Sequence, residues 1–375
     1  MNLTERDRQH LCAERVLEPQ VTDYLQAGIQ LLIFIIGAPV NTYMLYKLSG
    51  HLRSTRAFFL LNFHLNISDH IILYGYVLSE VAWILTWSWQ AGNIFCKMVK
   101  FMQMLALHIS SNVVVCISVD RVLLVVGSHI LKRRIRRVRA MVGIAWLAAI
   151  VCSSPQLFIW STAVDPCRQV TECVPIFVKY RWQSYSQDST VNVVSQQPSL
   201  MLHSYTEEKI YLMAHLILVF WIPLFTIAVC YSIILYKIWY RKTASDPYRH
   251  SGYRDSLDTI ISRYSFGRRS RSVVNSSSIG TAMTRVTARK AVSRTLKVTL
   301  LIICAYCFCW GPYNILALWN VLHRQSYVQF PLLVHGIEFL YVLIVANSLI
   351  NPFLYGQHTI RSSRRHHPRN VVRSV

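Results

Sequence analysis

The chain has 375 residues, of which 53% are hydrophobic and only 15% are charged. This composition lies on the apolar side of an ordinary soluble domain and indicates a protein whose solvent is lipid. The formal net charge of +22 would suggest nucleic acid in a polar chain, but here its meaning depends on where the basic residues lie. We expect a membrane protein that binds membrane lipid and no nucleic acid.

Seven stretches are long and apolar enough to span a bilayer, since a spanning helix needs about 20 mostly apolar residues. They predict an all-α membrane protein, a seven-transmembrane helix bundle that forms one domain over residues 24–356. No internal repeat is evident, which disfavours a transporter but leaves that class as an alternative. The stretches lie near residues 24–46, 57–82, 95–126, 140–160, 208–240, 295–322 and 330–356.

Basic residues concentrate in every second gap between these spans. The gaps after the first, third and fifth spans are strongly basic, as in 132–139, whereas the others mix acids and bases. The positive-inside rule therefore predicts a multi-pass plasma-membrane protein with an extracellular N-terminal segment, 1–23, and a short basic cytoplasmic tail, 357–375. The long gap 241–294 is rich in Ser, Arg and Tyr, and predicts a disordered cytoplasmic loop.

Six of the ten cysteines fall inside the spans and are interpreted as small buried side chains. Four others, Cys12, Cys96, Cys167 and Cys173, fall on the predicted oxidising side, where two disulfides are possible. Asn2, in Asn2-Leu3-Thr4, is a candidate glycosylation site on that side. We expect no zinc site and, because phosphate loops and nucleophile elbows are missing, no enzyme.

Eight motifs follow one another along the spans. In this order they resemble the rhodopsin-like G-protein-coupled receptors over residues 24–356, which implies activation of a heterotrimeric G protein. The motifs are Gly37-Ala38-Pro39-Val40-Asn41, Leu65-Asn66-Ile67-Ser68-Asp69, Cys96, Asp120-Arg121-Val122, Trp146, Pro223, Cys309-Trp310-Gly311-Pro312 and Asn347-Ser348-Leu349-Ile350-Asn351-Pro352-Phe353-Leu354-Tyr355.

A closer likeness comes from Glu80-Val81-Ala82-Trp83, the loop Trp89-Gln90-Ala91-Gly92, Ser154-Pro155-Gln156 and the run from Cys309 to Tyr313 followed by Trp319. These resemble the gonadotropin-releasing-hormone and adipokinetic-hormone receptor family, and we expect an invertebrate member. The resemblance implies an extracellular peptide ligand and the phospholipase C/calcium pathway. Vasopressin, oxytocin and cardioactive-peptide receptors share part of the pattern and remain the alternative within the class.

Two features narrow the ligand. The seventh span has no lysine for a retinal Schiff base and the third has no acid before Asp120, which disfavours an opsin and an amine receptor. Glu80 and Trp83, three apart on one helix face, match family residues that hold the N-terminal end of the peptide. The other candidate ligand-binding residues are Gln103, Tyr313, Trp319 and Glu338, although Trp319 equally fits an interfacial aromatic belt.

Asp69 is an acid inside an apolar span, where ionisable groups are costly and face the bundle interior with a partner. The resemblance implies that it coordinates a sodium ion with the oxygen-bearing residues Ser110, Asn347 and Asn351. The alternative is a protonated or water-paired Asp69 in a polar network. We expect no other cofactor.

The resemblance gives Arg121 two roles: it pairs with Asp120 at rest and reaches toward the G protein in the active state. Val122 stands where Tyr is usual, and Lys290-Ala291-Val292-Ser293-Arg294 contains no acid to clamp the sixth helix. We therefore predict appreciable ligand-independent signalling, with a receptor that binds peptide but couples poorly as another possibility.

The remaining switch residues lie on the last three spans. Pro312 and Pro352 each remove a helical hydrogen bond and are candidate hinges. The resemblance makes Trp310 the toggle beneath the ligand, with Tyr231 and Tyr355 moving toward Arg121 on activation.

Besides Val122, three positions depart from the family pattern. Ser111 and Tyr306 replace its usual apolar pair near Pro223, and Asn320 stands where Tyr follows the matching Trp. The resemblance also implies a Cys96–Cys173 disulfide, worth roughly 2–4 kcal/mol. Cys12–Cys167 is a speculative second bridge.

Overall fold

A computed structural model describes the backbone of residues 20–52, 57–126, 134–187, 197–243, 279–323 and 331–364. Side chains are described for 20–52, 57–126, 134–183, 205–240, 296–323 and 339–356. The elements are α2 (Val21–Ser49), α3 (Ala57–His70), η1 (Ile71–Val77), α4 (Leu78–Thr86), α5 (Gly92–Val126), α6 (Arg134–Ser153), α7 (Gln156–Ile159), β1 (Trp160–Val164), β2 (Thr171–Pro175), α8 (Ile176–Gln187), α9 (Gln197–Leu216), η3 (Ile217–Trp221), α10 (Ile222–Thr243), α12 (Ile279–Leu322) and α14 (Pro331–Arg364).

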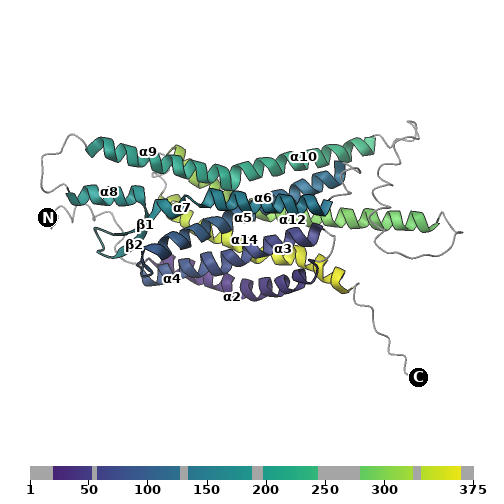
Figure 1. Ribbon diagram of the computed structural model, residues 1–375, viewed down its shortest axis with the longest axis horizontal. Coiled ribbons are helices and arrows are strands. Elements are labelled where there is room, and N and C mark those ends of the chain that lie inside the picture. The colour runs from purple at the N-terminus through teal and green to yellow at the C-terminus, as the bar shows by residue number, and fades with distance from the viewer. Residues whose placement is uncertain are drawn as a thin grey trace, which may run out of the picture.

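These elements build a bundle whose helices run along its long axis, with the hairpin β1–β2 at one end and the C-terminus at the other (Figure 1). Within the described residues, six helices are long and apolar enough to span a membrane. The second span, α3–η1–α4, falls short of that apolarity because its interior carries Asn62, Asn66 and Asp69, which are all buried. Together they make the predicted seven-span all-α fold.

Three helix ends differ from the sequence expectation. Helix α9 begins at Gln197 rather than near 208, and α12 begins at Ile279, inside the loop 241–294 predicted to be disordered. Helix α14 continues to Arg364, into the predicted tail. Hydropathy misses such ends because a polar stretch can continue a helix beyond the bilayer, where water satisfies its side chains. Pro198 does not prevent this in α9, because the first turn of a helix tolerates proline. Residues 244–278 lie outside the described part.

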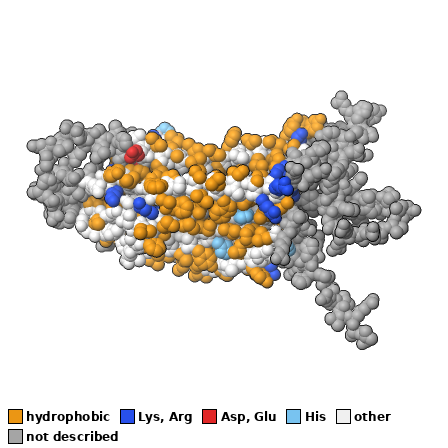
Figure 2. All heavy atoms as spheres, in the orientation of Figure 1, with side chains coloured by type: hydrophobic (Ala, Val, Ile, Leu, Met, Phe, Trp, Pro, Cys, Tyr) orange, Lys and Arg blue, Asp and Glu red, His pale blue; other side chains and the backbone are white. Residues whose placement is uncertain are grey.

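Hydrophobic side chains face outward along the middle of the bundle. Figure 2 shows them covering the visible middle, with Lys and Arg gathered toward the C-terminal end. Phe225 and Phe308 are about 70% exposed (71% and 69%), whereas the large side chains buried inside include Arg121, Tyr306 and Trp310. This inversion of the soluble-protein pattern is what a bundle solvated by lipid requires.

Two buried side-chain amides join three helices and replace a hydrogen bond that a proline removes. Pro352 has no N–H, so the Ser348 carbonyl one turn earlier loses its helical donor. Asn41 of α2 donates to that carbonyl at 3.0 Å. Asn66 of α3 donates to Asn41 Oδ1 at 2.7 Å and to the Tyr355 hydroxyl at 2.9 Å. The proline in α14 is therefore stabilised by the first two spans.

The strands β1 and β2 pair antiparallel, with Thr162 opposite Cys173. Cys173 forms a disulfide with Cys96, in the first turns of α5, which confirms the predicted bridge. The Trp89 amide donates to the Thr171 carbonyl at 2.7 Å. These links hold the hairpin over one end of the bundle, called the disulfide end below; the opposite end, which contains Arg121, is called the Arg121 end.

Candidate ligand cavity and switch

A cavity of about 570 Å³ lies at the disulfide end of the bundle. Three predicted ligand-binding residues, Glu80, Trp83 and Gln103, line it, from α4 and α5. The hairpin supplies further walls, including Trp160 and Glu172. The cavity thus brings together side chains from segments far apart in the sequence.

The Glu80 carboxylate connects the second and third spans. It accepts a hydrogen bond from Gln103 Nε2 at 3.0 Å, and the same amide nitrogen donates to Ser79 Oγ at 3.1 Å. Lys100, one turn from Gln103, places its Nζ 3.9 Å from Glu80 Oε2. Glu80 is therefore held in one orientation at the cavity wall.

Lys100 lies in an aromatic cage. Its ammonium lies over the Trp83 ring at 4.4 Å from the centroid and over the Trp160 ring at 4.8 Å. Cation–π contacts at these distances are favourable, more so where water is excluded. With Glu80 alongside, the arrangement shows that this wall of the cavity can hold a cationic group.

A second polar chain runs along the hairpin. Trp83 Nε1 donates to Glu172 at 2.8 Å, and Arg168 donates to the other Glu172 oxygen at 2.8 Å and to Asp165 at 3.3 Å. Burial raises the pKa of the Glu172 carboxyl, and the bonds from Trp83 and Arg168 oppose that shift. Arg168 also stacks its guanidinium 5.0 Å from the Trp87 ring centroid.

Charges around the cavity are unlike those of the chain as a whole. Its described walls carry four carboxylates and two cations, a balance of two negative charges in a chain whose net charge is +22. This local field favours a ligand with a positively charged group. The ionisable residues are Asp23, Glu80, Asp165, Glu172, Lys100 and Arg168.

The three other predicted ligand-binding residues lie differently. The Tyr313 hydroxyl accepts a hydrogen bond at 2.8 Å from Tyr341, which lines the cavity, so Tyr313 is one side chain removed from it. Trp319 is half-buried in α12 and is not part of the described cavity wall. The side chain of Glu338 lies outside the described residues.

The four predicted sodium ligands, Asp69, Ser110, Asn347 and Asn351, are all buried, and Asn351 contacts Asp69. Asp69 is fully buried and accepts hydrogen bonds from Asn351 Nδ2 at 3.1 and 3.4 Å. Ser110 Oγ, Asn347 Oδ1 and Asn351 Oδ1 are buried oxygens without a hydrogen-bond partner in the protein. A carboxylate and three unpaired oxygens are a donor set that fits a hard cation.

Asp120 has a partner that the sequence did not indicate. Arg134, the first residue of α6, donates from Nε to Asp120 Oδ1 at 2.8 Å and from a terminal nitrogen to Oδ2, a two-pronged pair. Arg121, the predicted partner, lies 3.8 Å from Oδ2 and places its guanidinium over the Phe58 ring at 5.9 Å. Asp120 and Arg121 are each 2% exposed.

Ser111 and Tyr306, the two residues that replace the family's usual apolar pair, contact one another. Their hydroxyls lie 3.1 Å apart, and Tyr306 also donates to the Val219 carbonyl of η3 at 3.3 Å. The Tyr306 ring lies 5.2 Å from that of Trp310, the predicted toggle, which is 1% exposed. A polar link between the third, fifth and sixth spans therefore lies directly beneath Trp310.

The two predicted switch tyrosines have different described partners. Tyr355 is fully buried and its hydroxyl accepts a hydrogen bond from Asn66, as described above. Tyr231 lies close enough to Arg121 and Thr299 to interact with both. Pro312 and Pro352 both lie within continuous helices.

Residues 41–355 match the family described as 7 transmembrane receptor (rhodopsin family). The chain belongs to this family. The receptor is 32% identical to the G-protein coupled receptor daf-38 of Caenorhabditis elegans, over 90% of this chain and 89% of that one. It is 27% identical to a gonadotropin-releasing hormone receptor of Octopus vulgaris, over 89% and 70% of the two chains.

A gonadotropin-releasing hormone II receptor of Chlorocebus aethiops is 25% identical, over 91% of this receptor and 77% of the relative. The predicted resemblance to the rhodopsin-like and gonadotropin-releasing-hormone receptors is thus confirmed. Such receptors are multi-pass membrane proteins.

The two remaining predicted sites fall largely outside the described residues. Cys167 is disulfide-bonded, but Cys12, its predicted partner, lies outside that part of the receptor. Asn2, the candidate glycosylation site, lies outside it as well.

Sequence reasoning missed several residues that shape the two ends of the receptor: Lys100, Arg168 and Glu172 at the cavity, and Arg134 beside Asp120. The signal available for Lys100 was its position three residues before Gln103, which puts both on one helix face. Arg168 and Glu172 lie in a hairpin that hydropathy does not detect.

Proposed function

We propose that this receptor binds an extracellular peptide of the gonadotropin-releasing-hormone or adipokinetic-hormone type in the cavity at the disulfide end. The observation that carries the proposal is the cavity wall of Glu80, Trp83 and Gln103, with Glu80 fixed by Gln103 at 3.0 Å. The gonadotropin-releasing-hormone receptors among its relatives support the same class of ligand.

The proposal includes an orientation. The disulfide end, with the N-terminus, faces outward, because the Cys96–Cys173 bridge needs an oxidising compartment and the opposite gaps carry the basic residues. The Arg121 end faces the cytoplasm, where the heterotrimeric G protein binds. We further propose coupling to the phospholipase C/calcium pathway, on the strength of the family resemblance.

Sodium belongs to the same proposal. Asp69, Ser110, Asn347 and Asn351 hold the ion in the resting receptor, supported by the three buried oxygens that lack a partner. A bound cation would supply the positive charge that the buried Asp69 carboxylate otherwise lacks.

Intracellular calcium in cells expressing the full chain tests the ligand proposal. The cells are challenged with gonadotropin-releasing-hormone-like, adipokinetic-hormone-like and vasopressin-like peptides. We expect a response to one of the first two groups, and a loss of at least tenfold in potency in Glu80→Gln, since a hydrogen bond to a charged group contributes about 1.5–3 kcal/mol.

Glu208→Gln is the matched control. Glu208 also forms an ion pair, with Arg181 at 2.7 Å, but it does not line the described cavity, so its potency should stay within about twofold of wild type. Equal losses in both variants would reject the cavity. A response to vasopressin-like peptides alone would reject the ligand class.

A further inference from the structure

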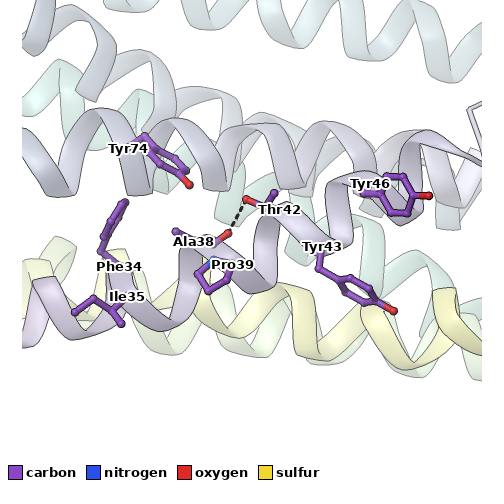
Figure 3. Close-up of a pocket in the computed structure, with 8 residues that line it drawn as sticks. All are labelled: Phe34, Ile35, Ala38, Pro39, Thr42, Tyr43, Tyr46 and Tyr74. Atoms are coloured by element: carbon purple, nitrogen blue, oxygen red, sulfur yellow. Dashed lines mark hydrogen bonds between the residues drawn. The ribbon is translucent and has the colours of Figure 1, made fainter.

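A second hollow lies on the outer surface of the bundle, between α2 and η1. It has a volume of about 600 Å³ and opens outward, away from the interior of the helix bundle (Figure 3). Phe34 and Tyr74 meet edge to face across it at 5.2 Å. Pro39 and Thr42 lie on its floor, and Tyr43 and Tyr46 lie toward the Arg121 end.

The hollow is apolar and pre-formed. Pro39 and the aromatic rings are stiff, and the Thr42 hydroxyl is held by a hydrogen bond to the Ala38 carbonyl at 2.8 Å, with His70 Nε2 at 3.4 Å. From Phe34 to Lys47 the helix rises about 20 Å, at about 1.5 Å per residue. That is slightly more than the hydrocarbon half-thickness of a bilayer, about 15 Å.

Besides the Tyr74 phenol, which lines the other end, a cation and two phenols gather at the end of the hollow toward Arg121. Lys47 places its Nζ over the Tyr43 and Tyr46 rings, 5.4 and 5.7 Å from their centroids. Within the described part of the receptor, Lys47 has no acidic partner and neither phenol has a hydrogen-bond partner. Tyr46 is 73% exposed. A group that enters here therefore meets one cation and two phenol donors at the membrane boundary.

We infer that this hollow between α2 and η1, called the groove below, is a binding site for an anionic phospholipid. The lipid belongs to the leaflet at the Arg121 end. One acyl chain lies along Phe34, Pro39 and Thr42, and the headgroup phosphate pairs with Lys47. Phosphate and glycerol ester oxygens can accept from all three donors, whereas a sterol offers one hydroxyl and leaves the cation unpaired. Charge complementarity therefore favours an anionic phospholipid over a sterol or a zwitterionic lipid.

Native mass spectrometry of the purified full chain in detergent tests this inference. Phosphatidylglycerol, phosphatidylcholine with the same acyl chains, and cholesterol are added as competing probes. We expect one tightly retained phosphatidylglycerol. Lys47→Gln should weaken it about fivefold, since one lysine near an anionic headgroup contributes about 1 kcal/mol, and Thr42→Phe, which fills the groove, should displace it.

Two matched controls lie on α10. Lys237→Gln removes a half-buried lysine near the same end of another span. Thr226→Phe enlarges a half-buried threonine that, like Thr42, donates to the carbonyl one turn earlier, at 2.9 Å. Both should retain the lipid.

The inference is independent of the peptide ligand, because no peptide is present in the measurement. Equal weakening by Lys47→Gln and Lys237→Gln would overturn it, since binding would then follow total charge. Cholesterol displacing phosphatidylglycerol from the wild type, but not from Thr42→Phe, would overturn it in favour of a sterol.

Discussion

Asp120 is shared unequally between two arginines. Arg134 makes the two-pronged pair, and Arg121 is left 3.8 Å away with an aromatic ring beside it. The proposed G-protein contact belongs to Arg121, so its freedom depends on how firmly Asp120 is occupied. Because Arg134 competes for Asp120, it should weaken the resting restraint on Arg121, which adds to the missing acid at the base of the sixth span.

Arg134→Gln should therefore lower ligand-independent signalling. Asp120 then pairs with Arg121 alone, and a stabilisation of the resting state by about 1 kcal/mol reduces the active fraction about fivefold. Basal inositol phosphate at matched surface expression is the measurement. Arg137→Gln is the control, because Arg137 lies on the same helix and lines, with Asp120 and Arg134, a small surface depression. If basal inositol phosphate in wild type is no higher than in cells without receptor, there is no ligand-independent signalling to lower. If Arg134→Gln raises basal inositol phosphate, Arg134 stabilises the resting state instead of weakening it.

We expect ligand-independent signalling to depend on sodium through Asp69. Replacing sodium by N-methylglucamine at constant ionic strength should raise basal nucleotide exchange in membranes, because the resting state loses its cation. Asp69→Asn removes the charge that attracts the ion, so its basal exchange should no longer respond to sodium. Equal sodium sensitivity in wild type and Asp69→Asn would show that the ion acts elsewhere.

Some single residues can be predicted from sequence and others cannot. An intramembrane acid needs a polar neighbour, and the family resemblance named Asn351 as one for Asp69; the two lie 3.1 Å apart. Arg134 was one of six basic residues within 132–139. Which of them reaches Asp120 depends on where α6 begins and how it packs on α5, and a charge run carries no such information.

Among the elements, η1 and η3 are π-helical segments, and η3 is the one that joins other spans through a side chain. Its wider turn leaves backbone groups of Ile217–Trp221 outside the ordinary ladder. Tyr306 of α12 donates to one of them, the Val219 carbonyl, while its hydroxyl also contacts Ser111 of α5. One phenol thus joins three helices just below Trp310.

Tyr306→Phe should loosen this junction without opening a cavity, since only the hydroxyl is removed. It leaves a buried Ser111 hydroxyl and a carbonyl without their partner, a cost of about 1–3 kcal/mol. We expect a lower melting temperature of the purified receptor and a change in basal signalling, with Ser111→Ala in the Tyr306→Phe background adding little. Fully additive losses in the double variant would mean that the two hydroxyls act separately.

The membrane-spanning helices could be predicted from the sequence, whereas the hairpin that covers one end of them could not. Lipid solvation forces about 20 mostly apolar residues per span, so hydropathy finds six helices clearly, while Asn62, Asn66 and Asp69 lower the apolarity of the second span. The hairpin 160–175 has no alternating apolar pattern; its register is set by the Cys96–Cys173 bridge and by the bond from Trp89 to Thr171. Those are tertiary contacts that a local pattern does not contain.

The whole molecule is electrically polarised. The bundle has an excess of carboxylates around the cavity at the disulfide end, while its net charge is +22 and its basic runs lie in the alternate gaps. Such a distribution favours cationic ligands at one end and anionic lipid at the other. The cavity and Arg121 lie at opposite ends, and the link through Trp310, Tyr306 and η3 runs between them.

The most direct test of the whole account is nucleotide exchange on a purified calcium-pathway G protein by the receptor in lipid nanodiscs. A gonadotropin-releasing-hormone-like or adipokinetic-hormone-like peptide should accelerate exchange by the wild type. It should still bind Arg121→Ala but no longer accelerate exchange. A peptide that binds the wild type without accelerating exchange on any G protein would contradict the account.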